Sequence, residues 1–80
     1  MLNIIAKNVK SKLTKKVQGK VSCYALGDKT IVCDIICNGN VYRYTEKYTS
    51  EEISFGLSSK TIADHILYSY VTHIRYKFFK

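Results

Sequence analysis

The chain has 80 residues, a length that leaves no room for a second domain. With 46% hydrophobic and 24% charged residues, its composition excludes a disordered tail. Its net charge of +7 is confined to one end, because residues 1–20 carry six lysines and no acid whereas residues 21–80 carry seven basic and six acidic residues. A bias confined to one segment is typical of proteins that contact an anionic partner. The six lysines are Lys7, Lys10, Lys12, Lys15, Lys16 and Lys20.

The cysteines and the start of the chain bear on the cellular compartment. Three cysteines, Cys23, Cys33 and Cys37, are an odd number with no secretory signal before them, so disulfides are not expected. The apolar run over residues 1–6 is interrupted by Lys7, too early for a signal core or a membrane span. The sequence therefore predicts a protein of the reducing cytoplasm, with no membrane partner.

Helical periodicity runs through the lysine-rich segment and predicts an amphipathic helix over residues 3–17. Asn3 is the expected N-cap, and Gly19 lies just past the expected end. The apolar positions that repeat at this spacing are Leu2, Ile5, Ala6, Val9, Leu13 and Val17. The lysines occupy the remaining arc, either as a solvated face or as a site for an anionic partner.

Three strands are predicted next, over Val21–Leu26, Thr30–Cys37 and Asn40–Tyr48, with turns at Gly27-Asp28 and Asn38-Gly39. Asn-Gly is the strongest short hairpin signal, because a type I′ turn needs positive φ at both central residues. A two-residue turn there pairs Cys37 with Asn40, Ile35 with Tyr42, Asp34 with Arg43 and Cys33 with Tyr44. The opposite charges of the Asp34–Arg43 pair support this register.

Alternation along the strands separates two sheet faces. The expected core face holds Tyr24, Leu26, Ile31, Cys33, Ile35, Tyr42 and Tyr44. The other face holds Val21, Cys23, Ala25, Val32, Asp34, Ile36, Val41, Arg43 and Thr45. The second face is more apolar than a solvated sheet face usually is, so either it is the true core or it meets another molecule.

Two helices complete the predicted fold. Thr49-Ser50-Glu51-Glu52 is a capping-box pattern, and Gly56 follows it, which predicts a short helix at 50–55. Ser58 or Ser59 then caps a long helix over about 59–78. Its expected core stripe is Ile62, Ala63, Ile66, Leu67, Tyr70, Val71, Ile74 and Phe78.

A second stripe lies almost opposite the first on the same helix, at His65, Tyr68, Thr72, Tyr76 and Phe79. Aromatic residues on both sides of a helix argue against burial of one side alone. Three arrangements account for the stripe: the first helix or the chain terminus covers it, a second copy covers it in a homodimer, or a foreign partner does. A dimer or partner surface is the interpretation that we carry forward.

The sequence holds no pattern typical of a metal site or an active site. Cys33 and Cys37 are four residues apart on a predicted strand, and His65 and His73 are eight apart on a predicted helix, unlike the close pairs of zinc sites. Neither a phosphate-binding loop nor a dinucleotide fingerprint is present. We therefore expect no metal, no cofactor and no catalytic residue.

The expected order, helix–three strands–helix, is similar to that of double-stranded RNA-binding domains. The stretch Phe55-Gly-Leu-Ser-Ser-Lys-Thr-Ile-Ala-Asp64 resembles the segment in which that family begins its second helix with a lysine-rich motif, of which Lys60 is retained. This resemblance implies direct binding of double-stranded RNA or DNA through the basic first helix.

The whole chain looks more like the small accessory proteins of Gram-positive prophages and other mobile elements, some of which are anti-CRISPR inhibitors. The resemblance lies in Glu52-Ile-x-x-Gly-Leu-Ser-Ser-x-x-Ile-Ala-x-x-Ile and in the ending with Tyr70, Ile74 and Phe78-Phe79-Lys80. It implies a non-enzymatic inhibitor, in the cytoplasm of a bacterial host, that binds the surface of a CRISPR-type nucleoprotein complex. A net charge of +7 excludes an acidic DNA mimic.

Together these expectations define one α+β domain over residues 1–80, with the element order α-β-β-β-(short α)-α. The leading function is inhibition of a host protein or ribonucleoprotein complex, and direct binding of double-stranded nucleic acid is the alternative.

Overall fold

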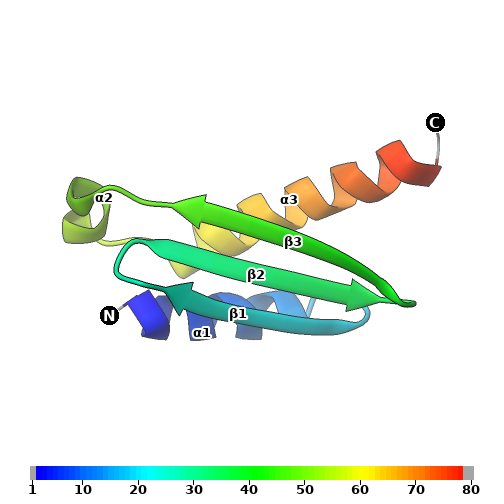
Figure 1. Ribbon diagram of the computed structural model, residues 1–80, viewed down its shortest axis with the longest axis horizontal. Coiled ribbons are helices and arrows are strands. Elements are labelled where there is room, and N and C mark those ends of the chain that lie inside the picture. The colour runs from blue at the N-terminus through cyan, green and yellow to red at the C-terminus, as the bar shows by residue number, and fades with distance from the viewer. Residues whose placement is uncertain (1, 79–80) are drawn as a thin grey trace.

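The computed structural model describes the backbone of residues 2–78 and the side chains of residues 2–74. A three-stranded antiparallel meander in the order β1-β2-β3 carries both long helices on one face, and its other face is open (Figure 1). The elements are α1 (Leu2–Thr14), β1 (Lys20–Leu26), β2 (Thr30–Cys37), β3 (Asn40–Lys47), α2 (Ser50–Phe55) and α3 (Ser59–Phe78). The predicted α+β fold and its element order are confirmed.

The first helix ends one turn earlier than predicted. Lys16 and Val17 both donate backbone hydrogen bonds to the Leu13 carbonyl, at 2.9 and 3.0 Å, and this tight turn closes the helix at Thr14. At the other end, Leu2 is already helical and buried, so the prediction of Asn3 as the N-cap is wrong. Burial of Leu2 extends the helix past the polar residue that would otherwise cap it.

The connection from α1 to β1 passes very close to the sheet at Gly19. Its φ is +118°, and a Cβ at this position would lie 2.3 Å from the carbonyl oxygen of Ile36. Only glycine therefore fits this bend without movement of the β2 backbone.

The hairpin between β2 and β3 follows the prediction in full. Asn38 and Gly39 have φ values of 52° and 79°, as a type I′ turn requires. The register pairs Cys37 with Asn40, Ile35 with Tyr42, Asp34 with Arg43 and Cys33 with Tyr44. The sheet face assigned to these strands is correspondingly correct.

The face assigned to β1 is wrong. Leu26 pairs with Thr30 across a loop of residues 27–29, which places Tyr24 opposite Val32. The predicted faces, which grouped Tyr24 with Ile31 and Cys33, require a register that differs from this one by one residue. An offset of one residue exchanges the two faces of a strand. The expected core residues Tyr24 and Leu26 therefore lie on the open face, whereas Val21, Cys23 and Ala25 face the helices.

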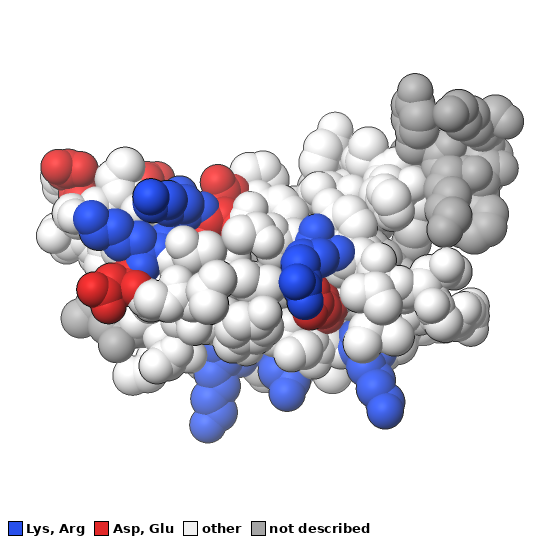
Figure 2. All heavy atoms as spheres, in the orientation of Figure 1, with Lys and Arg blue, Asp and Glu red and all other residues white. Residues whose placement is uncertain are grey.

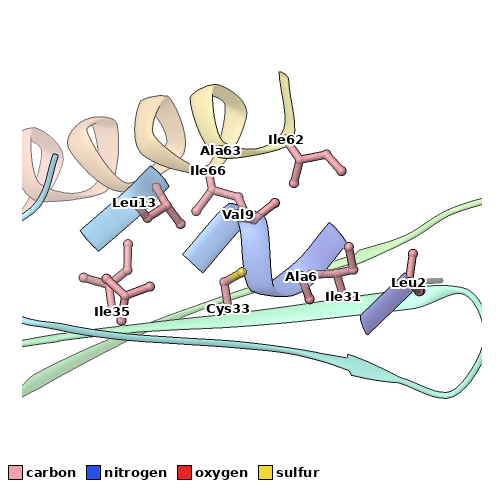
Figure 3. Packing of buried hydrophobic residues seen from close by; sticks show 11 residues of the cluster. Leu2, Ala6, Val9, Leu13, Ile31, Cys33, Ile35, Ile62, Ala63 and Ile66 are labelled. Atoms are coloured by element: carbon pink, nitrogen blue, oxygen red, sulfur yellow. The ribbon is translucent and has the colours of Figure 1, made fainter. Parts of the chain in front are cut away.

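The core lies between the sheet and the two long helices, and α1 contributes to it along its whole length (Figure 3). Ile62, Ala63 and Ile66 of α3 are buried as predicted, but Val71 is exposed. The second half of α3 runs past the end of α1 (Figure 1), so α1 offers no cover there. The Phe78 side chain lies outside the described residues. The buried cluster comprises Leu2, Ala6, Val9, Leu13, Val21, Ile31, Cys33, Ile35, Ile62, Ala63 and Ile66.

Local capping fixes both later helices. The Thr49 hydroxyl accepts a hydrogen bond from the Glu52 amide at 3.1 Å, and the Glu52 carboxylate accepts one from the Thr49 amide at 2.8 Å, so the predicted capping box is confirmed. Gly56 ends α2 with a φ of 98°. For α3 the cap is Ser58, whose hydroxyl accepts a hydrogen bond from the Thr61 amide at 3.2 Å.

Replacing Leu13 by alanine tests the central role of α1. We expect Leu13→Ala to lower the free energy of unfolding by about 2–5 kcal/mol, because the side chain is fully buried against two layers. Ile4→Ala, on the exposed side of the same helix, should cost less than about 0.5 kcal/mol. Urea unfolding measures both, and equal losses would contradict the packing described.

Candidate binding surfaces

The six lysines of the first twenty residues are exposed and mostly unpaired. Lys16 lies 4.0 Å from the Asp64 carboxylate, which is also 3.2 Å from Lys60. Among the described residues, the other five lysines make no ion pair. The positive charge predicted for this segment therefore lies at the surface. The only acid paired with it in the described residues is Asp64, which Lys16 shares with Lys60.

The position of this lysine cluster, defined as Lys7, Lys10, Lys12, Lys15, Lys16 and Lys20, follows from the packing of α1. Its apolar stripe faces β1 and α3, so its charged side chains point away from the core. Figure 2 shows basic side chains projecting beyond the lower edge of the molecule, where α1 and β1 lie. Most acidic side chains on this side lie instead toward the end that holds α2.

The open sheet face exposes four large apolar side chains among polar ones. Leu26 is 61% exposed and Val41 62% exposed, and Tyr24 and Ile36 are exposed beside them. Val32, at the centre of this face, is only 3% exposed, because it pairs with Tyr24 on one side and Thr45 on the other. The second predicted face is thus divided: Val21, Cys23 and Ala25 of β1 pack in the core, whereas its residues on β2 and β3 lie on the open face, where contact with another molecule stays a prediction.

An ion pair crosses the middle of the open face. Arg43 donates from Nε to Asp34 Oδ1 at 2.8 Å and from Nη2 to Oδ2 at 3.0 Å, a two-point contact. The hydrogen bonds from Arg43 lower the pKa of the Asp34 carboxyl, although partial burial opposes this. The two charges cancel at the centre of the open face. The contact also agrees with the predicted register, in which Asp34 lies opposite Arg43.

The second stripe on α3 is only partly described. Tyr68 is 73% exposed and Thr72 is exposed, so neither α1 nor another described element covers them. His65 is also exposed, but its ring lies 6.1 Å from the ring of Tyr44 on the sheet, centroid to centroid. The side chain of Tyr76, and Phe79 as a whole, lie outside the described residues, and cover by a second copy or a partner stays a prediction.

Large aromatic side chains join α3 to β3. The Tyr42 hydroxyl and the Ser69 hydroxyl share a hydrogen bond of 2.5 Å, and the Tyr42 ring lies 5.6 Å from Tyr70 and 4.9 Å from His73. The Tyr44 hydroxyl donates to Glu46 at 2.5 Å. Strand alternation predicts that Tyr42 and Tyr44 lie on the core face. No sequence pattern predicts the hydrogen bond between Tyr42 and Ser69.

Two hollows flank this aromatic joint. One of about 470 Å³ lies between the end of β3 and the start of α3, beside Tyr44, Tyr48 and His65, and one of about 150 Å³ lies beside Tyr42 and His73. Burial, together with the nearby Glu46 carboxylate, raises the pKa of Tyr48 to about 12, so its hydroxyl is neutral at physiological pH.

The described part of the chain holds neither a cluster of metal-ligating side chains nor a helix that could span a membrane. No three histidine, cysteine, aspartate or glutamate side chains there lie close enough to share a metal ion. No helix in residues 2–78 combines the length and the apolar character needed to cross a bilayer.

Comparisons with known proteins add no assignment: no protein family, no curated protein and no solved structure matches this chain. The fold and its surfaces therefore define the protein, as a small α+β domain with an open apolar sheet face beside a lysine cluster.

The Asp34–Arg43 pair has a pH-dependent effect on stability that can be measured. Because the pKa of Asp34 is lowered in the folded protein, the pair stabilises the fold above the ordinary value of 3.8 and loses this effect as the pH falls through the lowered pKa. Asp34→Asn should therefore melt below wild type at pH 7, and the difference should shrink in acid.

Asp28→Asn, in the exposed loop after β1, is the matched control, because Asp28 has no ion pair among the described residues. Thermal unfolding followed across the acid range compares the two variants with wild type. A deficit for Asp34→Asn that stays constant down to the lowest pH would contradict the assigned role of the pair.

Proposed function

We propose that this protein is a small, non-enzymatic binding protein that docks its open sheet face, with the lysine cluster beside it, on a nucleoprotein complex of a bacterial host. The observation that carries the proposal is the adjacency of exposed apolar side chains and unpaired lysines. In the inhibitor role implied by the prophage and anti-CRISPR resemblance, docking blocks a working surface of a CRISPR-type effector.

The apolar part of the surface supplies the affinity. Leu26 and Val41 stand on the two outer strands, so a partner that covers both must cover the whole width of the sheet. Tyr24 and Leu26 lie at one end of the open face and Ile36 and Val41 at the other, with the Asp34–Arg43 pair between them. Exposed apolar side chains gathered on one face of a small protein mark an interaction site more often than scattered ones do. Burying each such side chain is worth about 1.5–3 kcal/mol.

The charge of the surface selects the partner. Lys20 of the lysine cluster lies on β1 opposite Ile36, and Figure 2 shows basic side chains beyond the edge of the molecule where α1 and β1 lie. Arg43 on the open face is already paired with Asp34. A partner that fits is therefore anionic where it meets α1 and apolar where it meets the sheet. Bound nucleic acid beside protein in one complex offers both kinds of surface.

A second candidate function is direct binding of double-stranded RNA or DNA, and the five unpaired lysines favour it. The element order α1-β1-β2-β3-α3, interrupted by α2, supports this alternative through its likeness to double-stranded RNA-binding domains. Lys60, retained from the lysine-rich motif of that family, lies beside the cluster through the Asp64 carboxylate that it shares with Lys16.

Charge reversal in the lysine cluster tests direct nucleic-acid binding. If α1 binds phosphates, Lys7→Glu with Lys15→Glu should weaken binding to duplex RNA and DNA of any sequence and lower the slope of log affinity against log salt by about 0.9 for each lost contact. Lys29→Glu with Lys47→Glu changes the charge equally outside α1 and should have a smaller effect. Absence of duplex binding by wild type at low salt would exclude this candidate.

Substitution on the open face tests the leading proposal. Leu26→Asp with Val41→Asp should abolish binding to a guide-loaded CRISPR-type effector and restore its cleavage of target DNA, because an aspartate cannot be buried there without a partner. Phe55→Asp, at an exposed apolar position on α2 outside both surfaces, is the control and should retain binding. Titration calorimetry and a cleavage assay give the two readouts, and equal behaviour of the variants would contradict docking through the sheet.

A further inference from the structure

Two cysteines face each other across neighbouring strands on the helix-facing side of the sheet. Cys23 of β1 and Cys33 of β2 are direct partners in the strand register. Cys23, Cys33 and Cys37 are free thiols in this structure. Figure 3 shows the Cys33 side chain pointing from β2 toward α1, into the core.

The hydrogen-bond pattern of the sheet determines which kind of pair the two cysteines form. The Tyr48 amide donates to the Lys29 carbonyl at 2.7 Å, just beyond the paired strands. Because bonded and non-bonded pairs alternate along an antiparallel ladder, the odd-numbered residues of β2, Cys33 among them, exchange backbone hydrogen bonds with β3. Cys33 therefore forms a non-hydrogen-bonded pair with Cys23.

Non-hydrogen-bonded pairs bring their side chains closest. Their Cα atoms lie about 4.5 Å apart, within the range of about 4.4–6.8 Å that disulfides span. A bond between Cys23 and Cys33 thus needs rotation of side chains without a shift of strands. Cys37 has Asn40 as its partner across the β2–β3 hairpin and no cysteine opposite it.

We propose that Cys23 and Cys33 form an oxidation site, at which a peroxide converts the two thiols into a cross-strand disulfide that fastens β1 to β2. The Cys23 thiolate attacks one peroxide oxygen, which yields a sulfenic acid at Cys23 and releases the other oxygen as hydroxide, protonated to water. The Cys33 sulfur then attacks the Cys23 sulfur, the S–S bond forms, and the sulfenic oxygen leaves as a second water with the Cys33 proton. Two electrons pass from the thiols to the peroxide, and a dithiol reductant reverses the change.

The surroundings assign different roles to the two thiols. Cys23 is half-buried on an edge strand, whereas Cys33 is fully buried, so an oxidant reaches Cys23 first. A hydrogen bond from the Cys33 thiol, helped by the Lys10 ammonium, lowers the pKa of Cys23 although burial opposes it. The same hydrogen bond and burial raise the pKa of Cys33, so Cys33 keeps its proton and acts second.

The disulfide would stabilise the attachment of β1, the strand on which the lysine-bearing helix α1 packs. α1 packs on β1, and β1 is held in the sheet along one side only. Closing the loop between Cys23 and Cys33 removes conformational freedom from the unfolded chain. For a domain of this size we expect the melting temperature to rise by roughly 10–20 °C on oxidation.

The test is oxidation of the purified full-length protein with hydrogen peroxide under native conditions. Wild type should lose two hydrogen atoms in intact mass, keep Cys37 as its remaining thiol toward a maleimide in denaturant, and yield a peptide that links Cys23 to Cys33. The reducing agent dithiothreitol should reverse the mass change and the rise in melting temperature.

Matched variants separate this site from general thiol oxidation. Cys37→Ser should behave as wild type, whereas Cys23→Ser should neither form the link nor gain melting temperature. Cys33→Ala, which avoids a buried hydroxyl, should leave Cys23 to accumulate as a sulfenic or sulfinic acid. Links through Cys37, covalent dimers in place of the internal link, or unchanged wild-type thiols at a peroxide dose that oxidises the free peptide of residues 20–37 would overturn the proposal.

Discussion

The burial of one apolar stripe, on α1, is the constraint on which the rest of this domain depends. Val9 and Leu13 are fully buried between the sheet and α3, and α3 itself reaches β3 through tyrosines that act as spacers. A chain of 80 residues buries only about 60–65% of the surface that its unfolded chain exposes, so there is little second core to compensate for loss of this one. Because this stripe of α1 must face inward, the lysines of the helix are left together on its outer side.

The sequence predicts features that depend on neighbouring residues in the chain better than features that depend on contacts between distant elements. The capping box at Thr49 and the turn at Asn38-Gly39 are set by neighbours in the chain, and both are confirmed. The face of β1 depends on whether two or three residues form the loop after Leu26, a difference that no periodicity reveals, and there the prediction is wrong. Val71 is exposed because α1 ends too early to cover it, which depends on how two helices align in space.

The candidate surfaces divide in the same way. The lysine cluster could be predicted because charge is read directly from the residues and such side chains stay at the surface unless they are paired. The open face could not be assigned, since Tyr24 and Leu26 join it only through the offset of β1. Nor does periodicity show that Cys23 lies opposite Cys33, because the same offset places them together.

The close approach of Gly19 to the Ile36 carbonyl has a consequence for the lysines on either side of it. The chain between α1 and β1 is pinned to the sheet at this point, so Lys16 and Lys20 flank an anchored bend rather than a free linker. A flexible basic tail must give up backbone freedom when it meets a partner, and that loss weakens binding. Here the backbone is ordered before any encounter, and only the side chains of the lysines have freedom left to lose. The cluster is therefore a preorganised array of charges, whose spacing can match one arrangement of anionic groups better than another.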